Sequence, residues 1–144
     1  MIERVGTAVV IDPSAAVAIL LTEPGSDTLI AVIEEAGARF MSAASRVELG
    51  IVIEARFGPA GADVVSRFLR DAKIETVDVD ADLADRALGA WRRYGKGRHA
   101  AALNFGDCFV YALCERTGLP VVCTGADFAS TDLDTIRPER PELS

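Results

Sequence analysis

The chain has 144 residues, half of them hydrophobic, so it can bury one sizeable core without disulfides or structural metals. Its net charge of −7 argues against non-specific adhesion to nucleic acids or anionic membranes, although net charge says little about the chemistry of a local cleft. No apolar run approaches the roughly 20 residues of a membrane span, and the first residues lack a signal-peptide pattern, so we expect a cytoplasmic protein that does not bind membranes.

Short apolar strands and helices alternate through the first half of the chain. We predict a strand over 7–12, helices over 14–21 and 24–36, a weak strand over 38–42 and a helix over 43–57. The first strand is rich in β-branched residues and ends in Asp12-Pro13, where proline suits the first position of the next helix. Gly58-Pro59 ends the helix over 43–57.

The second half continues the alternation. A helical stripe over 64–69 precedes a strand over 74–79, and Asp80 is a predicted cap for a helix through Trp91. An apolar helix follows, beginning within 103–114 and ending at Thr117-Gly118, and a last buried strand covers 119–123. This order predicts a single α/β domain over 1–136, with a parallel central sheet of four to five short strands covered by helices on both faces. Residues 137–144 have the composition of a solvated tail.

Three cysteines, Cys108, Cys114 and Cys123, lie in these apolar segments and form no CxxC pair. Buried reduced thiols are therefore expected in preference to a disulfide or a zinc site.

Three aspartates are predicted at the carboxyl edge of the sheet, where ligands bind in open α/β folds. Asp12 and Asp127 follow apolar strands, and Asp107 opens the apolar helix packed between such strands. Each has an ordinary alternative role, because aspartate is a preferred helix cap and complements the dipole in a first helical turn. Taken singly, Asp12 and Asp107 are better explained by those roles.

Glu48 is not explained in this way, because it lies in the middle of a predicted helix. Its neighbours one turn away are small or apolar, and Arg46 lies on a different helical face. A carboxylate there needs a partner from elsewhere in the fold or a metal ion.

Carboxylates that gather at close range require a cation, and sites built from oxygen ligands favour Mg²⁺ or Mn²⁺. Two such ions can clamp the attacking and leaving oxygens of a phosphodiester without help from a histidine, so the single histidine, His99, is not required.

A basic segment precedes Asp107, since no acidic residue occurs between Arg86 and Asp107. A solvated face is its ordinary interpretation. Its position also makes four of its residues candidates for sequence-independent contacts with RNA phosphates: Arg92, Arg93, Lys96 and Arg98.

Four segments together resemble the PIN-domain ribonucleases and, more narrowly, the VapC toxins of type II toxin-antitoxin systems. They are Val10 to Ala15, Ser45 to Leu49, Leu103 to Cys108 with Tyr111 to Leu113, and Gly125 to Phe128. The resemblance implies a metal-dependent endoribonuclease whose acidic residues are Asp12, Glu48, Asp107 and Asp127. It also places Ser14 near the metal and Asn104 in the turn that directs Asp107. Ala126 departs from the asparagine that the family commonly has before the fourth acid, so the side-chain contact of that asparagine is missing beside Asp127.

The same resemblance implies two protein partners, a cognate antitoxin that blocks the acidic site and a second copy of the chain in a homodimer. The apolar segment 16–32, with Leu20, Leu21, Leu29 and Ile30, is a candidate groove for the antitoxin, and ordinary core packing explains it equally well.

Two other functions remain open at this point. The first is a non-catalytic protein-interaction module with the PIN fold, in which the acids only cap helices. The second is a small phosphohydrolase with Asp12 as nucleophile, although Ser14 occupies the place of the usual second acid. The sequence contains neither of the glycine-rich motifs of nucleotide-binding α/β proteins, GxxxxGK[ST] and GxGxxG.

Overall fold

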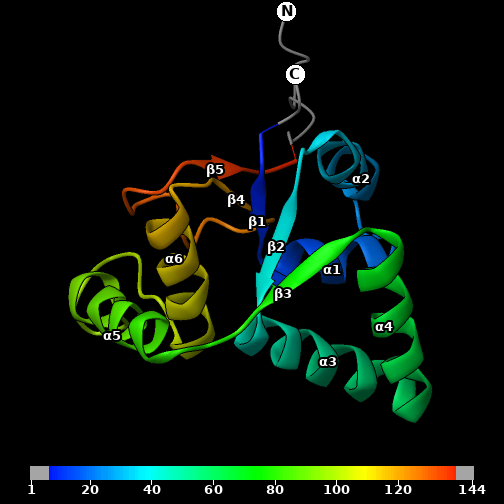
Figure 1. Ribbon diagram of the computed structural model, residues 1–144, viewed down its shortest axis with the longest axis horizontal. Coiled ribbons are helices and arrows are strands. Elements are labelled where there is room, and N and C mark those ends of the chain that lie inside the picture. Colours follow the sequence, from blue (N-terminus) through cyan, green and yellow to red (C-terminus); the bar gives the residue numbers. More distant parts are fainter. Residues whose placement is uncertain (1–6, 139–144) are drawn as a thin grey trace, which may run out of the picture.

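Five short parallel strands form one sheet in the computed structural model, which describes residues 7–138 (Figure 1). They are β1 (Val9–Ile11), β2 (Arg39–Ser42), β3 (Ile74–Val77), β4 (Val121–Val122) and β5 (Thr135–Ile136). The spatial order is β3-β2-β1-β4-β5, so the fully buried β1 lies in the middle. The predicted parallel sheet is confirmed, and its fifth strand lies in a segment where no strand was predicted.

Six α-helices and one 3₁₀ turn cover the two faces of the sheet in Figure 1. They are α1 (Pro13–Leu20), α2 (Ser26–Glu35), α3 (Ala43–Phe57), η1 (Gly58–Ala60), α4 (Gly61–Asp71), α5 (Ala81–Tyr94) and α6 (Phe105–Thr117). Val10 of β1 packs in one core with α5 and α6, whereas Val9 and Ile11 pack in a second core with α1 to α4. The alternation of side chains along a strand thus divides the core into two layers, as predicted for an α/β fold.

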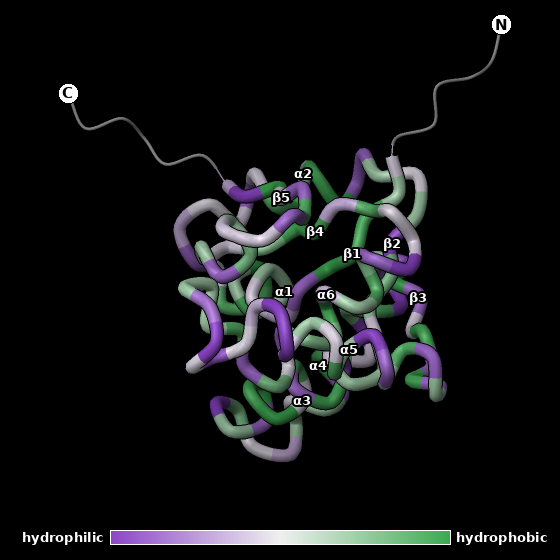
Figure 2. Tube along the Cα trace, turned by 90° about the vertical axis from the view of Figure 1, so that its left-hand side faces the viewer, coloured by the Kyte–Doolittle hydropathy of each residue, from purple (hydrophilic) through white to green (hydrophobic). Residues whose placement is uncertain are grey.

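Hydropathy follows this layering. The trace of β1 has hydrophobic colour in Figure 2, and hydrophilic stretches lie on the outer loops and helices. The three cysteines are free and buried, as predicted. Within residues 7–138, no helix is both long and apolar enough to cross a membrane.

Polar side chains set the helix starts that position the acids. Ser42 caps α3, with its hydroxyl accepting the Ser45 N–H at 3.1 Å, and Asn104 caps α6. Gly118 ends α6 in the left-handed conformation, with φ 74°, which glycine adopts without steric cost. The predicted tail falls mainly on 139–144, which lie outside the described residues, so the domain boundary near 136 stays a prediction.

Candidate active site

Asp12 lies at the turn between β1 and α1, where the parallel strand ends. Its carboxylate caps α1, with Oδ2 accepting the Ser14 N–H at 2.9 Å, and the residue is only 7% exposed. Burial raises its pKa from 3.8 to about 6, against the lowering effect of hydrogen bonds from Ser14. The charges of Glu48 and Asp127 raise it further. Asp12 therefore has the capping role expected for an isolated aspartate, and its pKa also responds to the charges of Glu48 and Asp127.

Asp107 forms a reciprocal capping box with Asn104 at the start of α6. Asp107 Oδ2 accepts the Asn104 N–H at 3.1 Å, and Asn104 Oδ1 accepts the Asp107 N–H at 2.8 Å. Burial raises the pKa of Asp107 to about 6, a backbone hydrogen bond from Asn104 lowers it, and the charges of Asp12 and Asp127 raise it. Asn104 thus fixes the direction of the half-buried Asp107 carboxylate.

Glu48 projects from α3 toward the first turn of α6. A Cβ at Gly106 would overlap Glu48 Oε1, so the absence of a side chain at Gly106 leaves room for this carboxylate. Burial of the carboxylate and the charge of Asp107 raise the Glu48 pKa. The face of α3 around Glu48 is apolar, as predicted. This face points outward, as the 64% exposure of Ile51 shows. Arg46 donates to Thr76 Oγ1 at 2.9 Å, which agrees with its predicted position on another face.

Asp127 lies in the exposed loop that follows β4. Three contacts help to hold this loop. Ser14 Oγ accepts the Thr124 N–H at 3.2 Å, Arg137 donates to the Gly125 carbonyl at 3.3 Å, and the Phe128 side chain is buried in the core. Ser14 therefore joins the Asp12 turn to the Asp127 loop, in addition to its bonds with Asp12.

A network that the sequence interpretation missed anchors the far end of the same loop. The Tyr111 hydroxyl donates to Asp132 Oδ1 at 2.6 Å, and Arg93 donates to the hydroxyls of Tyr111 and Tyr94 at 3.2 and 2.9 Å. Arg93 also pairs with Asp132 at 3.5 Å. A tyrosine in an otherwise apolar helix was the available signal, because a buried hydroxyl needs a hydrogen-bond partner.

The four candidate RNA contacts differ in their surroundings. Arg93 is engaged in the network just described, and Arg98 donates to the Arg92 carbonyl while its guanidinium lies 4.7 Å from the Trp91 ring centroid. Arg92 and Lys96 are exposed.

Four segments thus bring the four predicted acids to one edge of the sheet. There the charges of Glu48 and Asp127 raise the pKa of Asp12, and the charges of Asp12 and Asp127 raise the pKa of Asp107. Within residues 7–138, no three acidic, histidine or cysteine side chains are close enough to hold one metal ion in their present rotamers. The donors are all carboxylate oxygens, which suit Mg²⁺ or Mn²⁺, and their mutual repulsion favours a cation. The residue types fit such an ion, and binding would require side-chain rotation.

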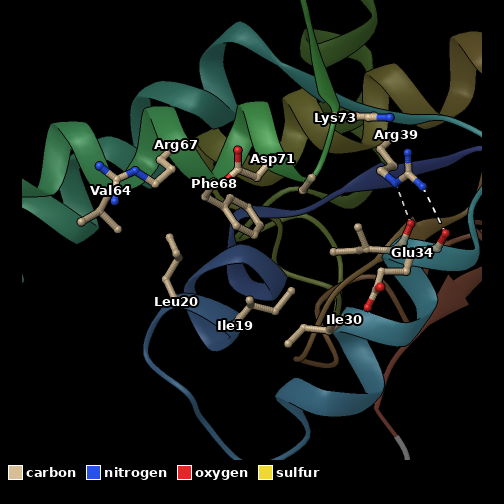
Figure 3. A pocket seen from close by; sticks show the side chains of 12 residues that line it. Ile19, Leu20, Ile30, Glu34, Arg39, Val64, Arg67, Phe68, Asp71 and Lys73 are labelled. Carbon is tan, nitrogen blue, oxygen red and sulfur yellow. Dashed lines mark hydrogen bonds between the residues drawn. The ribbon is translucent and has the colours of Figure 1, made fainter.

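A second feature is an apolar cavity of about 640 Å³ between α1, α2 and α4 (Figure 3). Of the four residues predicted for a partner groove, Leu20 and Ile30 line it, whereas Leu29 is fully buried in the core. Phe68 lies on the α4 side (Figure 3). The predicted segment therefore contributes both to the groove and to the core.

Comparison with known proteins identifies relatives over most of the chain. The model of the PIN domain family matches residues 9–133. Ribonuclease VapC of Mycolicibacterium smegmatis is 48% identical over 127 residues, which cover 88% of this chain and 98% of that protein. Ribonuclease VapC30 of Mycobacterium tuberculosis is 47% identical over 127 residues, covering 88% and 97%.

Solved structures share the fold at lower identity. The crystal structure of Mycobacterium tuberculosis VapC20, described as a Sarcin-Ricin loop cleaving toxin, has a TM-score of 0.75 and 18% identity, covering 90% of this chain and 99% of that chain. VapBC-5 of the same organism, a member of the VapBC family of toxin-antitoxin systems, has a TM-score of 0.65 and 20% identity, covering 91% and 98%.

Proposed function

This chain belongs to the PIN domain family and, within it, to the VapC ribonucleases, and from this premise we propose that it is a metal-dependent endoribonuclease toxin. It would hydrolyse RNA phosphodiester bonds at the carboxyl edge of the sheet. The observation that carries the proposal is the meeting of four acids from separate segments, where the charges of neighbouring acids raise the pKa of Asp12, Glu48 and Asp107. The main influences that lower the pKa of Asp12 and Asp107 are hydrogen bonds from Ser14 and Asn104.

The proposed ligands are Asp12, Glu48, Asp107 and Asp127, with Mg²⁺ or Mn²⁺ as the cofactor. When bound, the metal would lower the pKa of water and stabilise negative charge on the phosphate. Ser14 and Asn104 hold the carboxylates of Asp12 and Asp107 through their backbone N–H groups, which reduces the freedom lost on ligation. Asp127 depends on its loop for position, since Ala126 supplies no polar side chain beside it.

Substrate contacts in this proposal come from the basic segment. Arg92 and Lys96 are exposed and can contact RNA phosphates, and Arg98 combines its charge with the Trp91 ring. Arg93 is better assigned to anchoring the Asp132 loop, because Tyr111, Tyr94 and Asp132 engage its guanidinium.

We also propose a cognate antitoxin and a homodimer as protein partners. The groove of α1, α2 and α4 is apolar at its centre and carries Arg39, Arg67 and Glu34 among its lining residues, which suits an amphipathic segment of an antitoxin. Support for the homodimer comes from the outward apolar face of α3, where Val47 and Ile51 are exposed.

The test is cleavage of RNA by the purified chain, freed of antitoxin, in Mg²⁺ or Mn²⁺. Asp107→Asn should lower the cleavage rate at least about 100-fold, because the amide loses the ligand charge but can still accept the Asn104 N–H. Asp80→Asn is the matched control, since Asp80 caps α5 and pairs with Arg116. Unaltered cleavage in a chelator, or full activity of Asp107→Asn, would contradict the proposal.

A second function, a non-catalytic interaction module, is supported by the capping roles of Asp12 and Asp107 and by the lack of a metal-spaced triad in residues 7–138. Metal binding separates the two functions, because a ligand that binds only the folded state raises its stability. A thermal midpoint that Mg²⁺ and Mn²⁺ leave unchanged would favour the module.

A further inference from the structure

An apolar cavity of about 510 Å³ lies between α5 and α6, beside the acidic edge. Its walls include Leu88, Trp91, Phe105 and Phe109. Phe105 is 80% exposed and Trp91 is 42% exposed, although both rings would normally be buried in the core or at an interface. Two open aromatic rings around one cavity indicate a binding surface.

The cavity borders the candidate active site. Asn104 lines the cavity, and the same side chain accepts the Asp107 N–H. Phe105 directly precedes Gly106, over which Glu48 lies. A ligand in the cavity would therefore be adjacent to the acids.

The chemistry of the cavity favours a flat apolar group joined to an anion. Lys96 is the only charged residue that lines it, and Arg98 lies on the Trp91 ring. No acidic residue occurs between Arg86 and Asp107, in a chain whose net charge is −7. A symmetric dimer centred here would oppose each basic side chain to basic side chains of the second copy, which disfavours that occupant.

We infer that this cavity receives an unpaired nucleobase of the RNA next to the cleaved phosphodiester. The base contacts both Trp91 and Phe105, and Lys96 contacts its phosphate. Aromatic side chains are the usual platforms for unpaired bases, because every base has an apolar face. This inference rests on the proposed ribonuclease function and assigns to the same site a subsite that selects unpaired RNA.

The first experiment uses Trp91 as the probe, since it is the only tryptophan of the chain. The full chain in chelator is titrated with a ten-nucleotide oligoadenylate RNA and with an abasic chain of the same phosphates. Stacking should quench Trp91 fluorescence with oligoadenylate only, and the abasic chain should bind about 10-fold more weakly or worse. Equal affinity and equal quenching for the two would overturn the inference.

The second experiment compares two exposed phenylalanines. Phe105→Ala should weaken oligoadenylate binding about 10-fold and lower kcat/KM by a similar factor, whereas Phe57→Ala, at the far end of α3, should change neither. Unchanged binding by Phe105→Ala would overturn the inference. So would sedimentation in which Phe105→Ala converts a dimer to a monomer while oligoadenylate fails to quench Trp91, because a second copy would then cover the cavity.

These readouts also separate the inference from the proposed function. If the wild-type chain cleaves no RNA in Mg²⁺ or Mn²⁺ but oligoadenylate still quenches Trp91, the base site stands and the ribonuclease function fails. If RNA is cleaved equally well by wild type and Phe105→Ala, the function stands and the base site fails.

Discussion

Two aspartates cap helices that follow different strands of the same sheet, and their electrostatic surroundings are opposite. Asp80 caps α5 by accepting the Leu83 N–H at 2.8 Å, and Asp12 caps α1 by accepting the Ser14 N–H at 2.9 Å. The Leu83 N–H and the nearby Arg116 lower the pKa of Asp80. Asp12 is buried among other acids, and its pKa is raised to about 6.

The comparison separates structural acids from candidate functional ones. Where the start of α5 contacts the end of α6, the acids have basic partners, since Arg86 pairs with Asp82 and Glu115, and Arg116 pairs with Asp80 and Asp82. At the carboxyl edge of the sheet, Asp12 and Asp107 have capping hydrogen bonds but excess negative charge. Capping geometry is common to both regions, so the raised pKa of Asp12 and Asp107, caused by burial and neighbouring acids, is what points to function.

Neutralising one member of each region should change stability in opposite directions. Asp12→Asn keeps a good capping residue and removes a buried charge, so in chelator at pH 7 it should stabilise the fold by about 2 kcal/mol. The pKa change from 3.8 to about 6 corresponds to about 3 kcal/mol, and burial of the amide offsets part of it. Asp80→Asn should instead destabilise the fold, because the substitution removes the ion pair between Asp80 and Arg116. Urea unfolding of both variants measures the difference.

The pH dependence of the free energy of unfolding provides a check on the stability gain expected for Asp12→Asn. The Asp12 pKa is higher in the folded state, so folded Asp12 binds more protons than unfolded Asp12 between about pH 4 and 6. The penalty of its charge is therefore absent below pH 4 and complete above pH 6. The stability advantage of Asp12→Asn over wild type should grow across this window, and an advantage that is constant with pH would contradict the burial of an ionised carboxylate.

Metal addition should reverse the order of stability of wild type and Asp12→Asn. At about 100 times the dissociation constant, Mg²⁺ or Mn²⁺ should stabilise wild type by about 2.7 kcal/mol, since only the folded chain assembles the four acids. Asp12→Asn should gain little, and Asp80→Asn should gain as much as wild type. Thermal midpoints with and without each metal measure this, and equal gains in all three proteins would mean that the metal binds elsewhere.

Much of the fold was predictable because its signals are local. The β-branched run before Asp12-Pro13 gave β1, and the predicted helix over 43–57 matches α3 at both ends. β5 was not identified, because Thr135 and Ile136 form a strand only through pairing with β4, and two residues carry no periodic pattern. The start of α6 at Phe105 depends on the Asn104 capping box.

The site was predictable in its residue types and only partly in its environment. Strand ends and the PIN-domain resemblance indicated Asp12, Asp107 and Asp127, and the charge of Asp127 raises the pKa of the other two. The exposure of Glu48 and its position over Gly106 depend on the packing of α3 against α6, which sequence spacing does not specify. The engagement of Arg93 by Tyr111 and Asp132 is likewise a long-range contact.

The smallest expected effect concerns Glu48, which lies beside Asp107 at the acidic edge of the sheet. Gly106→Ala places a Cβ where Glu48 Oε1 lies, and the flexible carboxylate should move aside at little cost in stability. Gly89→Ala in α5 meets no atom within 4 Å and is the matched control, with a gain of about 0.5–1 kcal/mol from helix propensity. Cleavage assays should show about a 10-fold loss for Gly106→Ala alone, because small misplacements of a reacting group are costly. If both variants cleave RNA like wild type, the position of Glu48 over Gly106 does not matter for catalysis, and the excess charge that sets this edge apart from α5 belongs to the three aspartates.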